Sequence, residues 1–233
     1  MSASATPTLG RMSLLDLICP TQCAGCGTPG RMLCHRCALP LAAPAVRHYP
    51  TPCPAGMPAT YVVATYDGPT RALLLAFKER GAVGLAKPLG DVLARAVGAA
   101  LHRDQSVLLV PAPSAGAAVR RRGDDTVRLL AGRAARQLRL AGHRAVVVPG
   151  LVQARPVADS AGLSAPARAA NLAGALAVRP AVVRRLECRA VVVVDDLVTT
   201  GATMSEAAAA LTRVGAKVVG SAAIAATARR RNW

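Results

Sequence analysis

The run Val191-Val192-Val193-Val194-Asp195-Asp196-Leu197-Val198-Thr199-Thr200-Gly201-Ala202-Thr203 decides the fold. Its β-branched start predicts a buried strand over residues 190–194. Apolar residues at helical spacing after it predict a helix over residues 202–214, with Gly215 at the C-cap. A strand that passes through a short polar turn into a helix is typical of an open α/β sheet. Such sheets bind ligands beyond the carboxyl ends of their strands.

The turn between this strand and helix has the composition of a phosphate site. A helix N-terminus presents free N–H groups and a partial positive charge, which favour an anion. Gly201 lets the backbone come close to a ligand, and Thr199, Thr200 and Thr203 add hydroxyl donors. No Gly-Lys-Ser/Thr sequence follows a glycine-rich turn, so this is not a Walker loop.

The two acids that end the strand need a different partner. Asp195 and Asp196 would repel a phosphate, so we expect them to contact ribose hydroxyls or a hydrated Mg²⁺. The alternative is a strand–turn–helix junction with an incidental acidic pair. Two consecutive acids at the end of a four-valine strand are hard to justify on structural grounds alone, which favours the binding site.

The chain from residue 56 onward alternates apolar strands with helices. Further strands are expected at residues 61–66, 106–110, 145–148 and 217–224, and helices at residues 70–80, 85–101 and 125–140. We expect Thr70 to cap the first of these helices and Gly81 to end it. Continuous apolar strands that alternate with helices predict an α/β fold, an open and mostly parallel sheet with helices on both faces.

A small cysteine-rich unit precedes this domain. Cys23-x-x-Cys26 and Cys34-x-x-Cys37 offer four thiolates, which predicts a structural zinc ribbon because two such turns complete a tetrahedron. Four reduced cysteines in a loop are the alternative. His35 competes as a ligand, and a short ribbon can recruit Cys19 or Cys53, whereas Cys188 is interpreted as a small buried hydrophobe.

Prolines mark the boundary between the two units. Six of them lie within residues 39–59, which is a linker composition. We therefore divide the chain into a four-cysteine zinc ribbon with its Pro-rich linker, residues 13–55, and the α/β domain, residues 56–233. No apolar run approaches the roughly 20 residues that span a bilayer, and we expect a cytoplasmic protein without a membrane partner.

The charge balance is strongly basic. The chain has 29 Lys and Arg against 12 Asp and Glu, a formal net charge of +17. Such an excess favours phosphorylated or polyanionic partners and predicts weak, sequence-independent binding to single-stranded DNA. The runs 120–122 and 229–231, each three arginines, are the first residues to test. A general bias toward arginine and alanine explains the same excess equally well.

Taken together, these segments resemble the ComF family (competence protein F, also called amidophosphoribosyltransferase-like). The run 191–203 is similar to the signature with which type I phosphoribosyltransferases bind 5-phosphoribosyl-1-pyrophosphate (PRPP). Two further resemblances are Val110-Pro111-Ala112-Pro113-Ser114 followed by Arg120-Arg121-Arg122-Gly123, and Arg168-Ala169-Ala170-Asn171-Leu172. The sequence departs from the family where its usual Arg-Gly-Phe-Asn-Gln reads Arg-Gly-Asp-Asp-Thr, and many members have more cysteine pairs.

The resemblance implies a role for each segment. It places the PRPP 5-phosphate at Thr199, Thr200, Gly201, Ala202 and Thr203, with Asp195 and Asp196 as the catalytic pair at the ribose. It places the pyrophosphate at Pro111, Ala112, Pro113, Ser114 and Arg168, with Mg²⁺ bound alongside PRPP. Residues 153–170 would form a hood over the site, on which Arg155 is either a ligand or a solubilising charge. Lys78, which the family also tends to have, is interpreted as favourable last-turn helix chemistry.

Two functions from different classes remain open at this point. The first is a phosphoribosyltransferase that transfers the ribosyl group of PRPP to an unidentified acceptor. The second is a non-catalytic PRPP- or nucleotide-binding factor that binds DNA in competence (DNA uptake) or DNA processing, with a protein partner in that process. The second gains support because aromatic residues, on which a base would stack, are scarce.

Overall fold

The computed structural model describes residues 21–101, 106–113, 125–157 and 164–228. Ser114, the arginine runs 120–122 and 229–231, and Cys19 therefore lie outside the described residues. The helices are α2 (His35–Ala38), α3 (Gly68–Glu79), α4 (Ala86–Gly98), α6 (Thr126–Leu140), α7 (Ala165–Leu172), α8 (Val183–Leu186) and α9 (Ala202–Arg213). The strands are β1 (Val46–His48), β2 (Thr60–Thr65), β3 (Ser106–Pro111), β4 (Arg144–Val147), β5 (Leu151–Gln153), β6 (Leu176–Val178), β7 (Ala190–Val194), β8 (Leu197–Val198) and β9 (Lys217–Ala226).

The main sheet has the strand order β1-β2-β9-β7-β3-β4. All neighbours on this path are parallel except β1, which pairs antiparallel with β2 at the edge. The short β8 extends the sheet by pairing with the end of β9, where Leu197 lies opposite Ala225. The expected α/β architecture with a mostly parallel sheet is confirmed.

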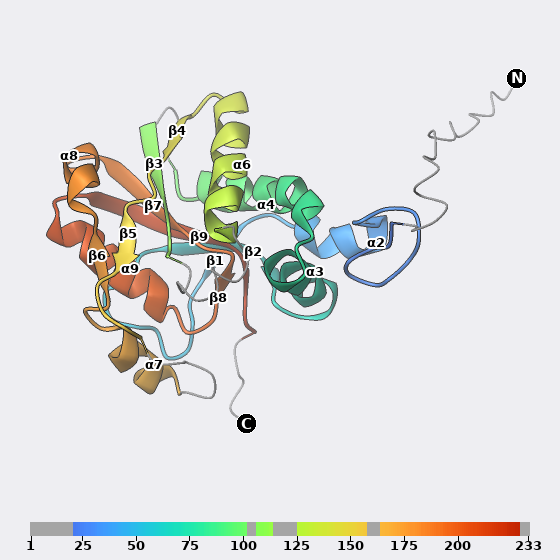
Figure 1. Ribbon diagram of the computed structural model, residues 1–233, viewed down its shortest axis with the longest axis horizontal. Helices are drawn as coiled ribbons and strands as arrows, with labels where there is room; N and C mark the ends of the chain where they lie inside the picture. Colours follow the sequence, from blue (N-terminus) through green and yellow to red (C-terminus); the bar gives the residue numbers. More distant parts are fainter. Residues whose placement is uncertain (1–20, 102–105, 114–124, 158–163, 229–233) are drawn as a thin grey trace, which may run out of the picture.

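Helices cover the two faces of this sheet, as Figure 1 shows. Helices α3, α4 and α6 lie on one face, where Leu73, Leu93 and Leu130 are among the fully buried side chains. Helix α9 lies on the other face, where Met204 and Leu211 pack in a second buried cluster with Val191 and Val193 of β7. Because both faces are covered, β7 is apolar at every position from Val191 to Val194, each without exposed surface.

Most of the predicted elements are found within a few residues of their expected bounds. Gly81 and Gly215 adopt positive φ angles of 67° and 78° after α3 and α9, which confirms them as helix ends. The Thr70 cap is wrong: α3 begins at Gly68 with Asp67 at the N-cap, and Thr70 is buried inside the helix. Pro69 causes the earlier start because its fixed φ suits the first turn of a helix.

Several short elements had no clear signal in the sequence. Strands β5 and β6 form a separate antiparallel pair, in which Leu151 lies opposite Val178. Strand β1 lies within the Pro-rich stretch, so part of that stretch belongs to the main sheet. Three-residue strands are too short for periodicity to reveal. The division of the chain at residue 55 stays a prediction.

Candidate functional site

The segments predicted to bind ligand meet at the carboxyl edge of the sheet. Strands β3 and β7 are neighbours, and Pro111 lies opposite Val194 at their ends. The Ala112 N–H donates to the Val194 carbonyl at 2.8 Å. Residues 111–113 therefore lie beside the acidic pair that follows β7, and only Ser114 of that segment is outside the described residues.

The two acids have different surroundings. Asp196 is 2% exposed, whereas Asp195 is only partly buried. The Asp196 N–H donates to Asp195 Oδ1 at 2.8 Å, which fixes the Asp195 carboxyl above the strand end. Lys78 Nζ lies 2.9 Å from Asp196 Oδ1 and 2.8 Å from Oδ2, so the buried carboxylate has a cationic partner.

These surroundings shift the acidity of Asp195. Burial raises the pKa of Asp195 well above its usual range, and the neighbouring Asp196 carboxylate raises it further. The Lys78 ammonium opposes this rise, and so does the hydrogen bond from the Asp196 N–H. This shift favours the protonated form of Asp195, which is the more accessible of the two acids to a ligand.

The turn at residues 199–203 requires glycine at its centre. Gly201 has a φ of 78° and is the N-cap of α9. A Cβ placed there would lie 2.5 Å from Met57 Sδ and 3.1 Å from Pro50 Cγ, so no other residue fits without displacing its neighbours. The Thr227 hydroxyl donates to the Thr199 carbonyl at 3.3 Å and ties the turn to the end of β9.

The donors of this turn remain accessible. Thr199, Thr200 and Thr203 are partly exposed, whereas Gly201 and Ala202 are buried. The first N–H groups of α9 lie at this end, because the first turn of any helix leaves its N–H groups without intrahelical acceptors. The hydroxyls and the first N–H groups thus lie at the same end of α9, where the Ala202 N–H donates to Thr200 Oγ1 at 3.5 Å in the ligand-free protein. Such donors suit a phosphate.

Helix α7 brings a cation to the same turn. Its N-cap, Ser164, accepts a hydrogen bond from the Ala167 N–H, and Arg168 lies one turn into the helix. Arg168 Nη1 donates to Thr199 Oγ1 at 3.1 Å, so Arg168 contacts the turn at residues 199–203, which we call the threonine turn. Its expected contact with pyrophosphate stays a prediction.

Arg155 donates hydrogen bonds to backbone carbonyls at the end of α7. Its Nη2 donates to the Asn171 carbonyl at 3.0 Å and to the Ala173 carbonyl at 2.7 Å. These carbonyls lie at the C-terminal end of α7, where a helix leaves its acceptors unsatisfied. Arg155 thus holds α7 in place, and the expected hood role of residues 153–170 includes residues 158–163, which lie outside the described residues.

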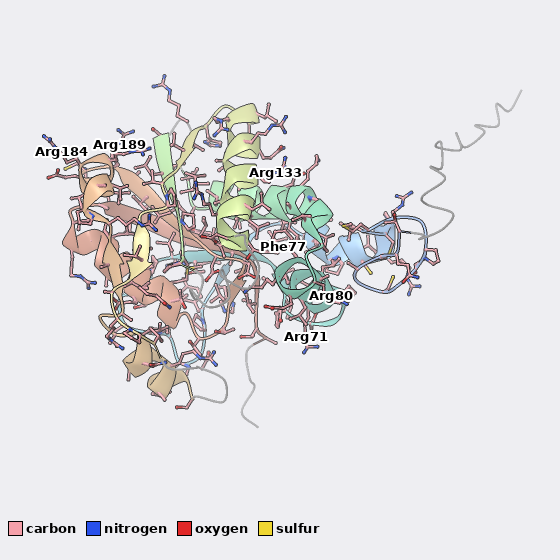
Figure 2. All side chains as sticks on the ribbon, viewed as in Figure 1. Arg71, Phe77, Arg80, Arg133, Arg184 and Arg189 are labelled. Carbon is pink, nitrogen blue, oxygen red and sulfur yellow. The ribbon has the colours of Figure 1, made fainter. Side chains whose placement is uncertain are left out.

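Lys78 is the site residue that the sequence interpretation missed. It lies in the last turn of α3, whose side chains Leu73, Leu74 and Phe77 are buried against the core. Figure 2 labels Phe77 on this helix, which covers the same face of the sheet as α4. Lys78 is visible in the segment Phe-Lys-Glu-Arg-Gly, residues 77–81. However, cations in the last turn of a helix are too common to indicate a partner elsewhere in the chain.

The four paired cysteines form the predicted cluster. The sulfur atoms of Cys23, Cys26, Cys34 and Cys37 all lie within 4.8 Å of one another, and those of Cys26 and Cys34 are 3.6 Å apart. This spacing fits one tetrahedral ion with metal–sulfur bonds of about 2.3 Å. The Cys34 N–H donates to Cys23 Sγ at 3.4 Å, a contact that stabilises a thiolate.

The pKa values of the buried thiols depend on burial and on the N–H groups and sulfur atoms around them. Burial raises the pKa of Cys23, but N–H groups of Cys34, Gly25 and Cys26 outweigh it and lower the pKa to about 6. Burial and the neighbouring sulfurs raise the pKa of Cys37. Thiolates crowd one another unless a cation lies between them, so this donor set fits a divalent metal.

The other two cysteines among the described residues, Cys53 and Cys188, lie outside this cluster. Cys53 is exposed, and its thiol donates to the Pro54 carbonyl at 3.8 Å. The prediction of a buried Cys188 is wrong: the residue is exposed, with a φ of 56°, in the turn between α8 and β7. Its N–H donates to the Gly215 carbonyl at 3.0 Å, so the turn and not the core decides its position.

The cysteine cluster packs directly against α3. Cys23 and Cys37 are each 2% exposed and belong to the same buried cluster as Leu73. A Cβ on Gly25 would lie 2.8 Å from Cys37 Sγ and 3.5 Å from Leu73 Cγ, so glycine permits this close approach. Figure 1 shows α2 next to α3, and the ribbon therefore supports the helix that carries Lys78.

Comparison with known families agrees with this geometry. Residues 128–232 match the family model described as a phosphoribosyl transferase domain. The matched region contains the acidic pair, the threonine turn and Arg168, whereas Lys78 and residues 111–113 precede it. No curated protein matches the chain.

The fold and the site thus define a protein with a phosphoribosyl transferase domain, preceded by a four-cysteine cluster that can hold a metal. Such a domain supports the binding of PRPP. Among the described residues, the helices are all too short or too polar to cross a bilayer.

Proposed function

We propose that this protein is a member of the ComF family that binds PRPP at the carboxyl edge of its sheet and transfers the ribosyl group to an acceptor. The observation that carries this proposal is the juxtaposition of Asp195 and Asp196 with the turn at residues 199–203, inside the region that matches the phosphoribosyl transferase domain. The acids and the groups that can donate hydrogen bonds to a phosphate lie a few residues apart in the chain, as the ribose and 5-phosphate of PRPP require.

Each group has a distinct task in this proposal. The threonine hydroxyls and the first N–H groups of α9 bind the 5-phosphate. The acidic pair accepts hydrogen bonds from the ribose hydroxyls, which orients C1 and stabilises the positive charge that develops there as pyrophosphate leaves. Residues 111–113, beside the acids, would line the pyrophosphate position together with Ser114 and Arg168. The protein supplies no covalent nucleophile.

Metals enter in two ways. Zn²⁺ would be held by the four clustered sulfurs as a structural ion, because four thiolates leave no open position for chemistry. Mg²⁺ would arrive with the pyrophosphate of PRPP and neutralise its charge. Carboxylate oxygens suit Mg²⁺, and Asp195 is the more accessible of the two acids. A location in the cytoplasm, where PRPP and reduced thiols occur together, is part of the same proposal.

The test of this function is release of pyrophosphate from PRPP. Purified protein with Mg²⁺ is incubated with PRPP and a panel of purines, pyrimidines, amines and oligonucleotides, and pyrophosphate is measured in a coupled assay. We expect release with at least one acceptor and its loss in the Asp195→Asn variant. No release with any acceptor, despite measurable PRPP binding, would favour the non-catalytic factor.

A second proposal rests on the end of β9. The strand reaches the site as Ile224, Ala225 and Ala226, followed by Thr227 and Ala228, and none of these residues offers a ring on which a base could stack. Combined with the net charge of +17, this favours a PRPP-binding factor that acts on DNA in competence or DNA processing. The acceptor panel separates the two proposals.

A further inference from the structure

The contact between Lys78 and Asp196 joins two parts of the molecule that are 118 residues apart in the chain. Asp196 is the less exposed acid, with 3% of its side chain accessible, whereas 32% of the Lys78 side chain is accessible. The ammonium group lies within 2.9 Å of both carboxylate oxygens. The carboxylate is therefore bound symmetrically from the side of α3.

This geometry matters because an isolated carboxylate is costly to bury. Without a cation, a buried acid either becomes protonated or moves toward water. Asp195 is adjacent, so two negative charges would otherwise lie side by side at the end of β7. The Lys78 ammonium group can balance one of these two negative charges and fix the orientation of the Asp196 carboxylate.

We propose that Lys78 is the positioning residue of the acidic pair: it holds the Asp196 carboxylate in place, and leaves Asp195 as the carboxyl that contacts the ribose. This inference rests on the proposed function and deepens it, because it divides the pair into a supporting acid and a ligand-facing acid. The Asp196 N–H already donates to Asp195 Oδ1, so the position of one acid sets that of the other.

The structure also shows why Lys78 is fixed strongly enough for this task. It belongs to the last turn of α3, which is anchored by Leu74 and Phe77 in the core. Arg80, just beyond the helix, donates to the Ala72 carbonyl at 3.2 Å and lies 3.5 Å from the Ala24 carbonyl of the ribbon. The helix end is thus supported from both the core and the ribbon.

The experiment is a double-mutant cycle on PRPP affinity, measured by calorimetry with Mg²⁺ below the melting temperature of each variant. Lys78→Met should weaken PRPP binding by about tenfold, as expected when a buried charge loses its partner. Lys78→Arg should retain affinity within about threefold, because Arg also donates to both carboxylate oxygens. Lys87→Met is the matched control, since Lys87 forms an exposed pair with Asp91 on α4 and should change nothing.

The decisive comparison is made in the Asp196→Asn background. If Lys78 acts through Asp196, adding Lys78→Met to Asp196→Asn should leave the PRPP affinity of that variant unchanged, which is strong non-additivity. The Asp195→Asn variant should lose PRPP binding, whether residue 78 is the native Lys78 or is changed by Lys78→Met. A purely structural ion pair would lower the melting temperature of Lys78→Met and leave the PRPP affinity as in the wild type.

Three results would overturn the inference. The first is wild-type affinity in a folded Lys78→Met variant. The second is an additive loss in the double variant, which would make Lys78 a direct ligand of PRPP. The third is retained binding in Asp195→Asn. Absence of PRPP binding by the wild-type protein is a separate outcome, which would contradict the proposed function itself.

Discussion

The Asp195 carboxylate destabilises the ligand-free protein, and ligand binding can offset this destabilisation. Burial and the Asp196 carboxylate both disfavour its charged form, and this raises its pKa. Replacing it with a neutral residue of the same shape should therefore stabilise the free protein at neutral pH. We expect Asp195→Asn to raise the free energy of unfolding by about 1 kcal/mol, a typical gain when a functional residue is relieved of strain.

The pH dependence of this gain follows from the direction of the pKa shift. An acid whose pKa is raised by folding stabilises the native state below its unfolded value of about 3.8, and this contribution is lost as the pH rises through the folded pKa. The difference between Asp195→Asn and the wild type should thus be largest near pH 7 and shrink toward pH 4. Denaturant unfolding at a series of pH values measures it, and a wild type that is the more stable protein at pH 7 would contradict the argument.

At the scale of elements, the ribbon and α3 form one structural unit. The cysteine cluster packs on Leu73, so loss of the metal should loosen α3 as well as the ribbon. Purified protein should contain one zinc per chain. Cys23→Ser and Cys37→Ser should lose this zinc, lower the melting temperature, and increase hydrogen exchange in both the ribbon and α3.

The chain offers matched controls for this experiment. Cys53 and Cys188 are exposed and lie outside the cluster, so Cys53→Ser and Cys188→Ser should retain zinc and stability. A full equivalent of zinc in a Cys23→Ser and Cys37→Ser double variant would remove the metal from this site. Zinc loss without any change in α3 would show that the ribbon is independent of the domain.

The sequence predicted those elements whose signals are local. The strands β3, β7 and β9 have continuous apolar runs, and helices α4 and α6 have apolar residues at helical spacing, so their positions were clear. Strands β1, β5 and β6 are three residues long and form only because a partner strand is nearby. Periodicity cannot reveal such elements.

The residues of the candidate site also divide into those with a local signal in the sequence and those that depend on tertiary packing. The threonine turn and the acidic pair are contiguous in the chain, so their chemistry could be inferred from residue types alone. The contact between Lys78 and Asp196 depends on how α3 packs against the core, and the exposed position of Cys188 depends on a turn. Both are consequences of tertiary packing, which one sequence does not specify locally.

At the scale of the whole molecule, the dominant feature is positive charge. Arg184, Arg185 and Arg189 are all exposed, and Figure 2 shows Arg184 and Arg189 near α8, on the side of the molecule away from α3. We expect weak binding to single-stranded DNA whose affinity falls linearly with salt on logarithmic axes, because arginines displace counterions from phosphates. Duplex should compete nearly as well, since a stacking platform needs aromatic residues that the chain has in small number.

Fluorescence anisotropy across a salt series measures this binding. Neutralising Arg184, Arg185 and Arg189 should flatten the salt slope by about one unit for each lost phosphate contact. The same test applies to the arginine runs 120–122 and 229–231. Tight binding that is selective for single strands and indifferent to salt would reveal a base-reading surface and contradict a mechanism based on phosphates alone.

In the proposed function, PRPP binding depends on the acidic pair and the threonine turn. This dependence is tested most directly by calorimetric titration of PRPP with Mg²⁺ into the wild-type protein and into the Asp195→Asn, Asp196→Asn double variant. We expect saturable binding at one site per chain in the wild type, and no detectable heat in a double variant that still unfolds cooperatively. Equal PRPP affinity in the two proteins would remove the acidic pair from the site and contradict the account.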